Sequence, residues 1–393
     1  MTNRELFFRF LGQTSGSPLA IEIDRAEGIH LYSSSGERYI DLISGIGVSN
    51  LGHGHAEVVE AVRDQAGRYM HLMVYGELVQ SPQVLLAQIL CSLLPQSLNN
   101  VYLVNSGAEA TEGAIKLAKR FSGRSRVISF RNAYHGSTHG ALSVGGNESI
   151  KRAFRPLLPG ITVLEFNNFQ QLKAINHQTA CVIVEPIQGE SGAIPAADGF
   201  LNEIRNACDR AGSLLIFDEI QSGFGRSGKL WAFEHAGVTP DILLLAKSMG
   251  AGMPIGAFVA PENIMKSLTH SPVLGHITTF GGNAVCAAAA LAHLKVIERT
   301  KIWEQVPRKE QLFRDLLIHP AIRGVRGKGL MLAVEYDSFE VVKKVVARCL
   351  KDGLLTDWFL FADNCLRIAP PLIITDEQIV EACTIILKAS DGV

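Results

Sequence analysis

The chain has 393 residues and a formal charge of −1, because 37 lysines and arginines stand against 38 aspartates and glutamates. A hydrophobic fraction of 47% and a charged fraction of 19% exclude a disordered or fibrous protein, and the length predicts two or three structural units. The near-neutral charge, with no basic block, argues against nucleic acid or anionic lipid as a partner.

The N-terminal segment, residues 1–55, is predicted to contribute to a small domain. Residues 1–11 carry charged side chains among apolar ones, so they lack the uninterrupted apolar stretch of a signal peptide. Residues 21–41 predict a polar hairpin around Ser35 and Gly36. The seven cysteines are scattered singly, which favours reduced thiols over disulfides or a zinc site. We therefore expect a cytoplasmic protein.

The middle of the chain, residues 56–280, is predicted to form a large α/β domain. Short apolar runs there alternate with helix-length segments such as 108–121 and 201–211, a pattern typical of a mostly parallel sheet with helices on both faces. The runs predicted as strands are residues 101–104, 126–130, 181–184, 214–217, 242–246 and 257–259. The most apolar long stretch, 241–261, is interrupted by Lys247 and by glycine and proline, so no membrane span is expected.

The last segment, residues 281–393, completes the predicted small domain. It begins with a long helical pattern from 284 to about 299. A second helix at 339–350 and strands at 329–335 and 366–368 follow. Together with the N-terminal segment they predict a smaller α+β domain assembled from both ends of the chain.

Three candidate sites follow predicted strands, at the edge where parallel α/β sheets bind ligands. Ser106, Gly107 and Ala108 stand where a strand turns into a helix, which suits either an anion such as phosphate or an ordinary helix cap. Asp218, with Gln221 just beyond, would be a buried carboxylate that needs a cationic or hydrogen-bonding partner. A protonated pyridine nitrogen is one candidate, and a structural arginine is the alternative. Lys247 ends another buried strand before a glycine-rich turn, a placement that suggests Schiff-base chemistry.

Other motifs carry weaker signals. Residues 223–228 match G-x-G-x-x-G, but the acidic residue that a dinucleotide site needs at the end of the next strand is replaced by Lys247. Residues 52–55, Gly-His-Gly-His, have no third ligand cluster, so a turn is favoured over a metal and no metal site is predicted. Cys91 and His135 form no recognisable nucleophile pair.

Taken together, the motifs resemble the class III (subgroup II) aminotransferases. These are pyridoxal-phosphate enzymes of fold type I that include acetylornithine, ornithine and 4-aminobutyrate aminotransferases. The resemblance covers nearly the whole chain. The matching segments, in the family's order, are 41–46 with 51–55, 105–110, Tyr134-His135-Gly136, 185–190, 218–223, Lys247 and 278–283.

The resemblance implies a role for each matching residue. Lys247 would form the Schiff base with the cofactor aldehyde and then act as acid and base. Asp218 would keep the pyridine nitrogen protonated, Gln221 would bind near the phenolic oxygen and Tyr134 would stack on the ring. Cofactor binding is also implied for His135 and Glu185, and phosphate binding for Ser106, Gly107 and Ala108. Thr279 would reach the phosphate from a neighbouring subunit, which implies a homodimer with shared active sites.

Two residues bear on the substrates. Arg367 matches the arginine that binds an α-carboxylate, and Glu190 matches the glutamate that masks this arginine when the reactive amine is distal to the carboxylate. The pair favours 2-oxoglutarate and glutamate in one half-reaction and an ω-amine in the other. Ser137 departs from the pattern, because acetylornithine, ornithine and 4-aminobutyrate enzymes usually carry a carboxylate-anchoring arginine there.

The sequence thus predicts a ping-pong aminotransferase that uses 2-oxoglutarate and an amino donor such as ornithine, N-acetylornithine, 4-aminobutyrate or lysine. An aminomutase or a decarboxylase on the same fold is the alternative, although the Glu190 and Arg367 pair argues against it. A non-catalytic dimeric binding protein is disfavoured, because every matching cofactor position holds a competent residue.

Overall fold

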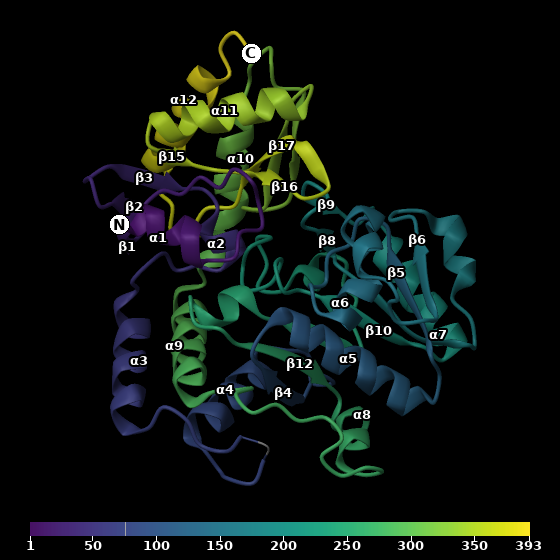
Figure 1. Ribbon diagram of the computed structural model, residues 1–393. Helices are drawn as coiled ribbons and strands as arrows, with labels where there is room; N and C mark the ends of the chain where they lie inside the picture. Colours follow the sequence, from purple (N-terminus) through teal and green to yellow (C-terminus); the bar gives the residue numbers. More distant parts are fainter. Residues whose placement is uncertain (75) are drawn as a thin grey trace.

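The computed structural model describes residues 1–74 and 76–393, and its centre is a seven-stranded sheet (Figure 1). The strand order is β4-β12-β11-β10-β7-β5-β6. Only β12 runs against its neighbours, pairing antiparallel with β4 and β11. The strands are β4 (Asn100–Val104), β5 (Arg126–Phe130), β6 (Ile161–Leu164), β7 (Thr179–Val184), β10 (Leu214–Asp218), β11 (Ile242–Leu245) and β12 (Gly256–Ala260).

Helices cover this sheet, and α5 (Gly107–Ser122) illustrates how the sequence sets their bounds. The Ser106 hydroxyl accepts a hydrogen bond from the Glu109 N–H at 3.2 Å and caps the helix start, and Gly123 ends it in the left-handed conformation. A β-carbon at Gly113 would lie 2.3 Å from the Phe258 ring, so glycine lets α5 approach β12. The other helices of this part are α3 (Ala56–Arg68), α4 (Ser81–Ser92), α6 (His139–Val144), α7 (Phe200–Ala211), α8 (Glu262–Met265) and α9 (Ala284–Thr300).

Both ends of the chain meet in a smaller unit at the top of Figure 1. The C-terminal β15 pairs in parallel with the N-terminal β3, and four more C-terminal strands form an antiparallel sheet in the order β13-β14-β17-β16. The strands are β1 (Ile23–Glu27), β2 (His30–Ser33), β3 (Arg38–Asp41), β13 (Gly324–Gly327), β14 (Leu332–Glu335), β15 (Leu354–Leu355), β16 (Trp358–Phe359) and β17 (Ala362–Ile368). The helices are α1 (Asn3–Phe10), α2 (Ser44–Gly47), α10 (Val306–Leu316), α11 (Phe339–Lys351) and α12 (Asp376–Ala389).

The predicted α/β fold is confirmed, with a mostly parallel sheet and a smaller unit built from both termini. All six strands predicted in the middle of the chain are present, and the predicted hairpin at 21–41 is the antiparallel β1, β2 and β3. The pattern missed β6, which borders the sheet. The domain boundaries at 55 and 280 stay a prediction, and α9 packs against α3 and α4. None of the described helices combines the length and apolar character needed to cross a bilayer.

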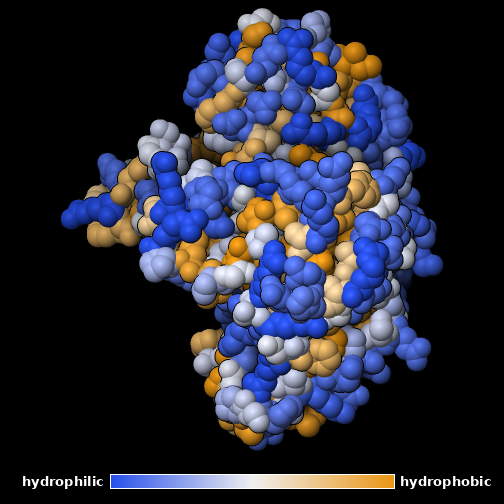
Figure 2. Space-filling model, turned by 90° about the vertical axis from the view of Figure 1, so that its right-hand side faces the viewer, coloured by the Kyte–Doolittle hydropathy of each residue, from blue (hydrophilic) through white to orange (hydrophobic). Residues whose placement is uncertain are grey.

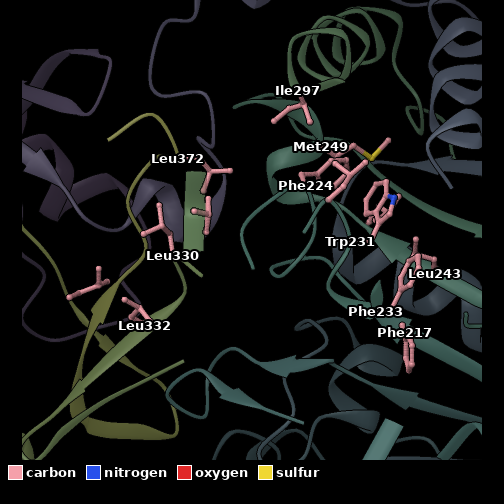
Figure 3. Close-up of a cluster of buried hydrophobic side chains, with 14 of the residues drawn as sticks. Phe217, Phe224, Trp231, Phe233, Leu243, Met249, Ile297, Leu330, Leu332 and Leu372 are labelled. Carbon is pink, nitrogen blue, oxygen red and sulfur yellow. The ribbon is translucent and has the colours of Figure 1, made fainter. Parts of the chain in front are cut away.

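One hydrophobic cluster spans the contact between the two units (Figure 3). Phe224, Trp231 and Met249 come from the large unit, while Leu330 and Leu372 face them from the C-terminal part. Burial of side chains of this size stabilises a fold by about 1.5–3 kcal/mol each, so the contact between the units is part of the core. In the side view of Figure 2 the surface is mostly hydrophilic, with hydrophobic side chains gathered in patches around the middle of the molecule.

His293 on α9 makes the stability of this core sensitive to acid. Its side chain is fully buried, and neither ring nitrogen has a hydrogen-bond partner among the described residues. Burial, with a smaller contribution from His55, lowers the pKa of His293 to about 3. Below pH 6.5 the unfolded chain therefore binds a proton that the folded chain excludes. The free energy of unfolding falls as the pH drops from about 6.5 to about 3, by about 1.4 kcal/mol per pH unit.

We expect His293→Leu to remove this part of the acid sensitivity. The loss of unfolding free energy between pH 7 and pH 5 should be about 2 kcal/mol smaller in the variant than in the parent, as measured by urea denaturation. The exposed His177 provides the matched control, and His177→Leu should keep the parental pH dependence. An identical pH dependence in His293→Leu and the parent would contradict this account.

Candidate active site

The candidate site lies at the carboxyl-end edge of the central sheet. Strands β4, β5, β7, β10 and β11 point the same way, and the residue or loop after each of them reaches one cavity of about 530 Å³. Most of the predicted site residues line it: Ser106, Gly107, Ala108, Tyr134, His135, Glu185, Glu190, Asp218, Gln221 and Lys247. The structure therefore brings together residues that are far apart in the sequence.

Lys247 begins a short 3₁₀ turn, η5 (Lys247–Gly250), directly after β11 and Ala246. Its φ of +47° lies in the left-handed region, a costly conformation for a residue with a long side chain. Among the described residues its Nζ has no ion-pair partner. Burial lowers the pKa of Lys247, and Arg367 adds to this, although Glu190, Asp218 and Glu185 oppose it. A larger share of this amine is therefore neutral near pH 7 than is usual for lysine.

Asp218, the last residue of β10, is held by two donors. The Ile220 N–H donates to its Oδ1 at 3.0 Å, and His135 Nδ1 lies 2.6 Å from its Oδ2. Burial acts to lower the pKa of His135, but the hydrogen bond and the charge of Asp218 outweigh it and raise the pKa. Nε2 of His135 is buried without a partner among the described residues. The pair therefore presents a fixed carboxylate to the cavity.

Glu185 follows β7 and accepts two backbone hydrogen bonds. The Tyr134 N–H donates to Oε1 at 3.0 Å and the Gly189 N–H donates to Oε2 at 2.9 Å. Burial raises the pKa of Glu185 to about 7, with a contribution from the nearby Asp218 charge. This carboxyl group ties the loop after β5 to the loop after β7, so Tyr134 is held at the cavity wall.

Arg367 lies on β17, behind Glu190. Its Nη1 and Nη2 donate to the two Glu190 carboxylate oxygens at 3.1 Å each, and its Nε donates to Asp357 Oδ1 at 2.8 Å. The guanidinium also stacks 4.4 Å from the centre of the Phe359 ring. Burial opposes ionisation of Glu190, but the charge and hydrogen bonds of Arg367 prevail and lower the pKa of Glu190. Arg367 is only 3% exposed, and its Nη2 also donates to the Trp358 carbonyl at 3.1 Å, so two carboxylates and a backbone oxygen hold its fork.

The start of α5 forms the anion-binding part of the cavity. Backbone N–H groups at Gly107 and Ala108 belong to the first turn of a 16-residue helix and have no partner within it. A β-carbon at Gly107 would meet the Ile220 side chain at 2.8 Å, so a larger residue here would force Ile220 to move. Gln221 is equally confined, because a β-carbon on Gly189 would lie 1.7 Å from its Oε1.

Two predicted residues do not line the cavity: Arg367, which lies behind Glu190, and Thr279. Thr279 is exposed. The sequence also gave no sign of Asp357 as the second partner of Arg367, nor of the contact between His135 and Asp218. The Gly-His-Gly-His motif at residues 52–55 has a structural contact, since His53 Nε2 lies 2.8 Å from Asp41 Oδ2.

Known proteins resemble this chain along nearly its whole length. The family model described as aminotransferase class-III matches residues 12–389. An acetylornithine aminotransferase of Methanocaldococcus jannaschii is 40% identical, over 92% of this chain and 91% of the relative. A [LysW]-aminoadipate semialdehyde/glutamate semialdehyde transaminase of Sulfolobus acidocaldarius is 37% identical, over 93% and 94%.

Solved structures give the same result. An ornithine aminotransferase from Toxoplasma gondii, whose active site holds PLP at partial occupancy, superposes with a TM-score of 0.91 and 31% identity. The alignment covers 98% of this chain and 92% of that one. A transaminase from the marine bacterium Virgibacillus gives a TM-score of 0.92 at 25% identity, over 99% and 98% of the two chains.

Proposed function

We propose that this chain, which belongs to the class-III aminotransferase family, transfers an amino group from an ω-amine donor to 2-oxoglutarate in two alternating half-reactions. Membership of the family makes it a pyridoxal-phosphate-dependent transaminase, and the proposal concerns the donor, the acceptor and the order of events. The observation that carries it is the pairing of Glu190 with Arg367 at the cavity that Lys247 lines.

The described residues fit pyridoxal phosphate. The helix start at Gly107 and Ala108 offers backbone donors for a phosphate, and the fixed Asp218 carboxylate offers an acceptor for a protonated ring nitrogen. Lys247, with no ion-pair partner among the described residues, is the amine for the aldehyde. When bound, the cofactor supplies an aldehyde that exchanges amino groups and a ring that takes up electrons from the substrate carbon.

Lys247 is proposed to carry the proton in both half-reactions. Its lowered pKa provides a neutral amine that can take a proton from the substrate carbon and return it. Asp218, fixed by His135 and by the Ile220 N–H, would keep a positive charge on the ring nitrogen. Tyr134 and Gln221, both at the cavity wall, would hold the plane of the ring.

Glu190 is proposed to act as a gate for Arg367. A substrate α-carboxylate can replace the Glu190 carboxylate on the same two guanidinium nitrogens, while Asp357 keeps its contact with Nε. Glutamate and 2-oxoglutarate would bind in this way. An ω-amine donor places no carboxylate there, so Glu190 would stay on Arg367 and neutralise it. One cavity would thus serve both kinds of substrate.

The names of the relatives support the donor class. Ornithine and N-acetylornithine carry a reactive amine far from the α-carboxylate, and acetylornithine and ornithine aminotransferases are among the similar proteins. Here Ser137 Oγ lies 3.0 Å from Tyr134 Oη, where many of the family carry an arginine. We therefore expect donors with a distal carboxylate, namely ornithine, N-acetylornithine and 4-aminobutyrate, to react less well than diamines.

A donor panel tests the proposed function. Ornithine, N-acetylornithine, lysine, 4-aminobutyrate and diamines are each supplied with 2-oxoglutarate, and the glutamate formed is measured. At least one ω-amine should yield glutamate, and glutamate alone should convert the bound cofactor and release 2-oxoglutarate. If glutamate leaves the cofactor spectrum unchanged, the proposed amino exchange with glutamate is refuted. An aminomutase or a decarboxylase then becomes the better account.

Glu190→Gln should shift the balance between the substrates. Without the charge that neutralises Arg367, α-carboxylates compete more easily for the guanidinium, so kcat/KM for glutamate should rise relative to the ω-amine by about tenfold. The exposed Glu304 offers a matched control, and Glu304→Gln should leave the ratio unchanged. A ratio that Glu190→Gln also leaves unchanged would refute the gate.

We also propose a homodimer in which Thr279 serves the neighbouring active site. Thr279 is exposed beside a groove of about 540 Å³ and a patch of exposed hydrophobic side chains that association would cover. The patch consists of Met70, Leu72, Met73, Leu78, Val79, Val84, Val273, Leu274, Ile277 and Phe280. Sedimentation should give twice the mass of the 42.6 kDa chain, and a monomer with full activity would disprove the shared site.

A further inference from the structure

The turn at residues 223–228 has no role in the mechanism so far, although its glycine pattern is conspicuous in the sequence. It begins two residues after Gln221 and contains Arg226, whose side chain is 1% exposed. The side chain points into the contact between the two units of the fold, where its hydrogen-bond partners lie in the N-terminal segment and the C-terminal unit. The turn therefore connects the cavity with both ends of the chain.

Arg226 ties three segments together. Its Nη1 donates to the Leu330 carbonyl at 3.0 Å and to the Pro370 carbonyl, and its Nη2 donates to Asn50 Oδ1. Leu330 and Arg226 are hydrogen-bonded twice, because the Leu330 N–H in turn donates to the Arg226 carbonyl at 2.9 Å. Asn50 Nδ2 likewise donates to the Phe224 carbonyl at 2.9 Å.

One of the Arg226 hydrogen bonds is made to the segment that follows the Arg367 strand. Pro370 comes three residues after Arg367, just past the end of β17, and a small internal cavity is lined by Arg226, Gln221 and Arg367 together. Figure 3 shows Leu330 and Leu372 on the C-terminal side of this contact and Phe224 on the other. Arg226 therefore fixes the backbone after Arg367 against the turn that follows Gln221.

Stability alone does not explain why a buried arginine stands at this position. All three acceptors of the guanidinium are neutral oxygens, and Nε has no partner among the described residues. Burial lowers the pKa of Arg226 to about 9, opposed only by the charge of Asp41. Apolar side chains of similar volume often replace buried charges without loss of stability, so geometry is the better reason for an arginine here. A planar fork can hold diverging acceptors that a lysine cannot hold together.

We propose that Arg226 is a positioning residue that sets the Arg367 guanidinium relative to the cofactor, and so controls the binding of α-carboxylates. The proposal rests on the proposed function, in which Arg367 binds that carboxylate. Arg226 does not line the cavity that Lys247 lines. Its loss should displace the end of β17 and weaken carboxylate binding, while leaving the chemistry of Lys247 intact.

Two small nucleophiles separate these effects in the holoenzyme. Aminooxyacetate and methoxyamine both attack the cofactor aldehyde, but only the first carries a carboxylate, so the ratio of their rates reports carboxylate binding. In Arg226→Lys the ratio should fall about tenfold, with the methoxyamine rate within about twofold of the parent. The KM for 2-oxoglutarate should rise more than kcat falls, and Arg226→Met should show the larger effect.

Arg367→Lys distinguishes failure of this inference from failure of the proposed function. If it leaves the ratio unchanged, Arg367 does not bind the carboxylate and the proposed function fails. If it lowers the ratio but Arg226→Lys does not, only the positioning role is overturned. Asn50→Ala removes one acceptor of Arg226 and leaves the arginine in place, so it should lower the ratio less than Arg226→Lys does. It serves as the test variant if the Arg226 variants do not fold. Equal loss of both rates in well-folded variants would also overturn the inference.

Discussion

Replacing Lys247 with alanine is expected to lower turnover by at least about 10³-fold, because the variant loses both the amine for the aldehyde and the acid and base of the proton transfer. Cofactor binding should persist in part, since the start of α5 and Asp218 remain in place. Steady-state kcat with 2-oxoglutarate and the absorption spectrum of the purified variant measure the two effects separately.

The control for this variant is Lys295→Ala. Lys295 is an exposed lysine on α9, so its loss should change kcat by less than about twofold. The lowered pKa of Lys247 provides a second readout, because the parent and Lys295→Ala should both lose activity as this amine is protonated at acid pH. A Lys247→Ala enzyme that transaminates at the parental rate would remove the basis of the account.

Asp218→Asn should have the second largest effect, a loss of about 10²–10⁴-fold in kcat/KM. The amide keeps the shape of the side chain but loses the charge that would hold the ring nitrogen protonated. It also removes the charge that raises the pKa of His135 and contributes to the raised pKa of Glu185. Both pKa values should therefore fall in the variant, a change that NMR titration of labelled histidine can follow for His135.

The exposed Asp363 provides the matched control for Asp218, and Asp363→Asn should retain parental kcat/KM. The stability of the variant needs a separate check, because Asp218 accepts the Ile220 N–H inside the cavity wall. If Asp218→Asn binds the cofactor and retains kcat/KM, the Asp218 carboxylate is not needed to keep the ring nitrogen of the cofactor protonated. If the pKa of His135 stays raised in the variant, another group must be responsible.

The strands and the residues after them were predictable because their signals are local. A buried strand in a parallel sheet is a short apolar run, and Asp218 and Lys247 are the charged residues that stand at the end of two such runs. The sheet edge then gathers them without any further information. β6 escaped prediction because Thr162 interrupts its short apolar run, as suits a strand at the edge of the sheet.

The pairings inside the site were not predictable from local patterns. His135 and Asp218 are 83 residues apart, and Glu190 and Arg367 are 177 apart, so their contacts depend on the strand order and on how β17 meets the large unit. Arg226 belongs to the same class, since its partners lie in three separate segments. The resemblance to a family supplied the Glu190 and Arg367 pair, while the contacts of Asp357 and Arg226 arise only in the folded chain.

The attachment of the cofactor to Lys247 is the claim on which the mechanism depends, and reduction with borohydride tests it directly. The holoenzyme is reduced, digested and analysed by mass spectrometry for the lysine that carries the pyridoxyl group. The account predicts one label per chain, on Lys247. A label on Lys151 or Lys309, both buried lysines, or an unlabelled Lys247 in a protein that had bound the cofactor, would contradict it.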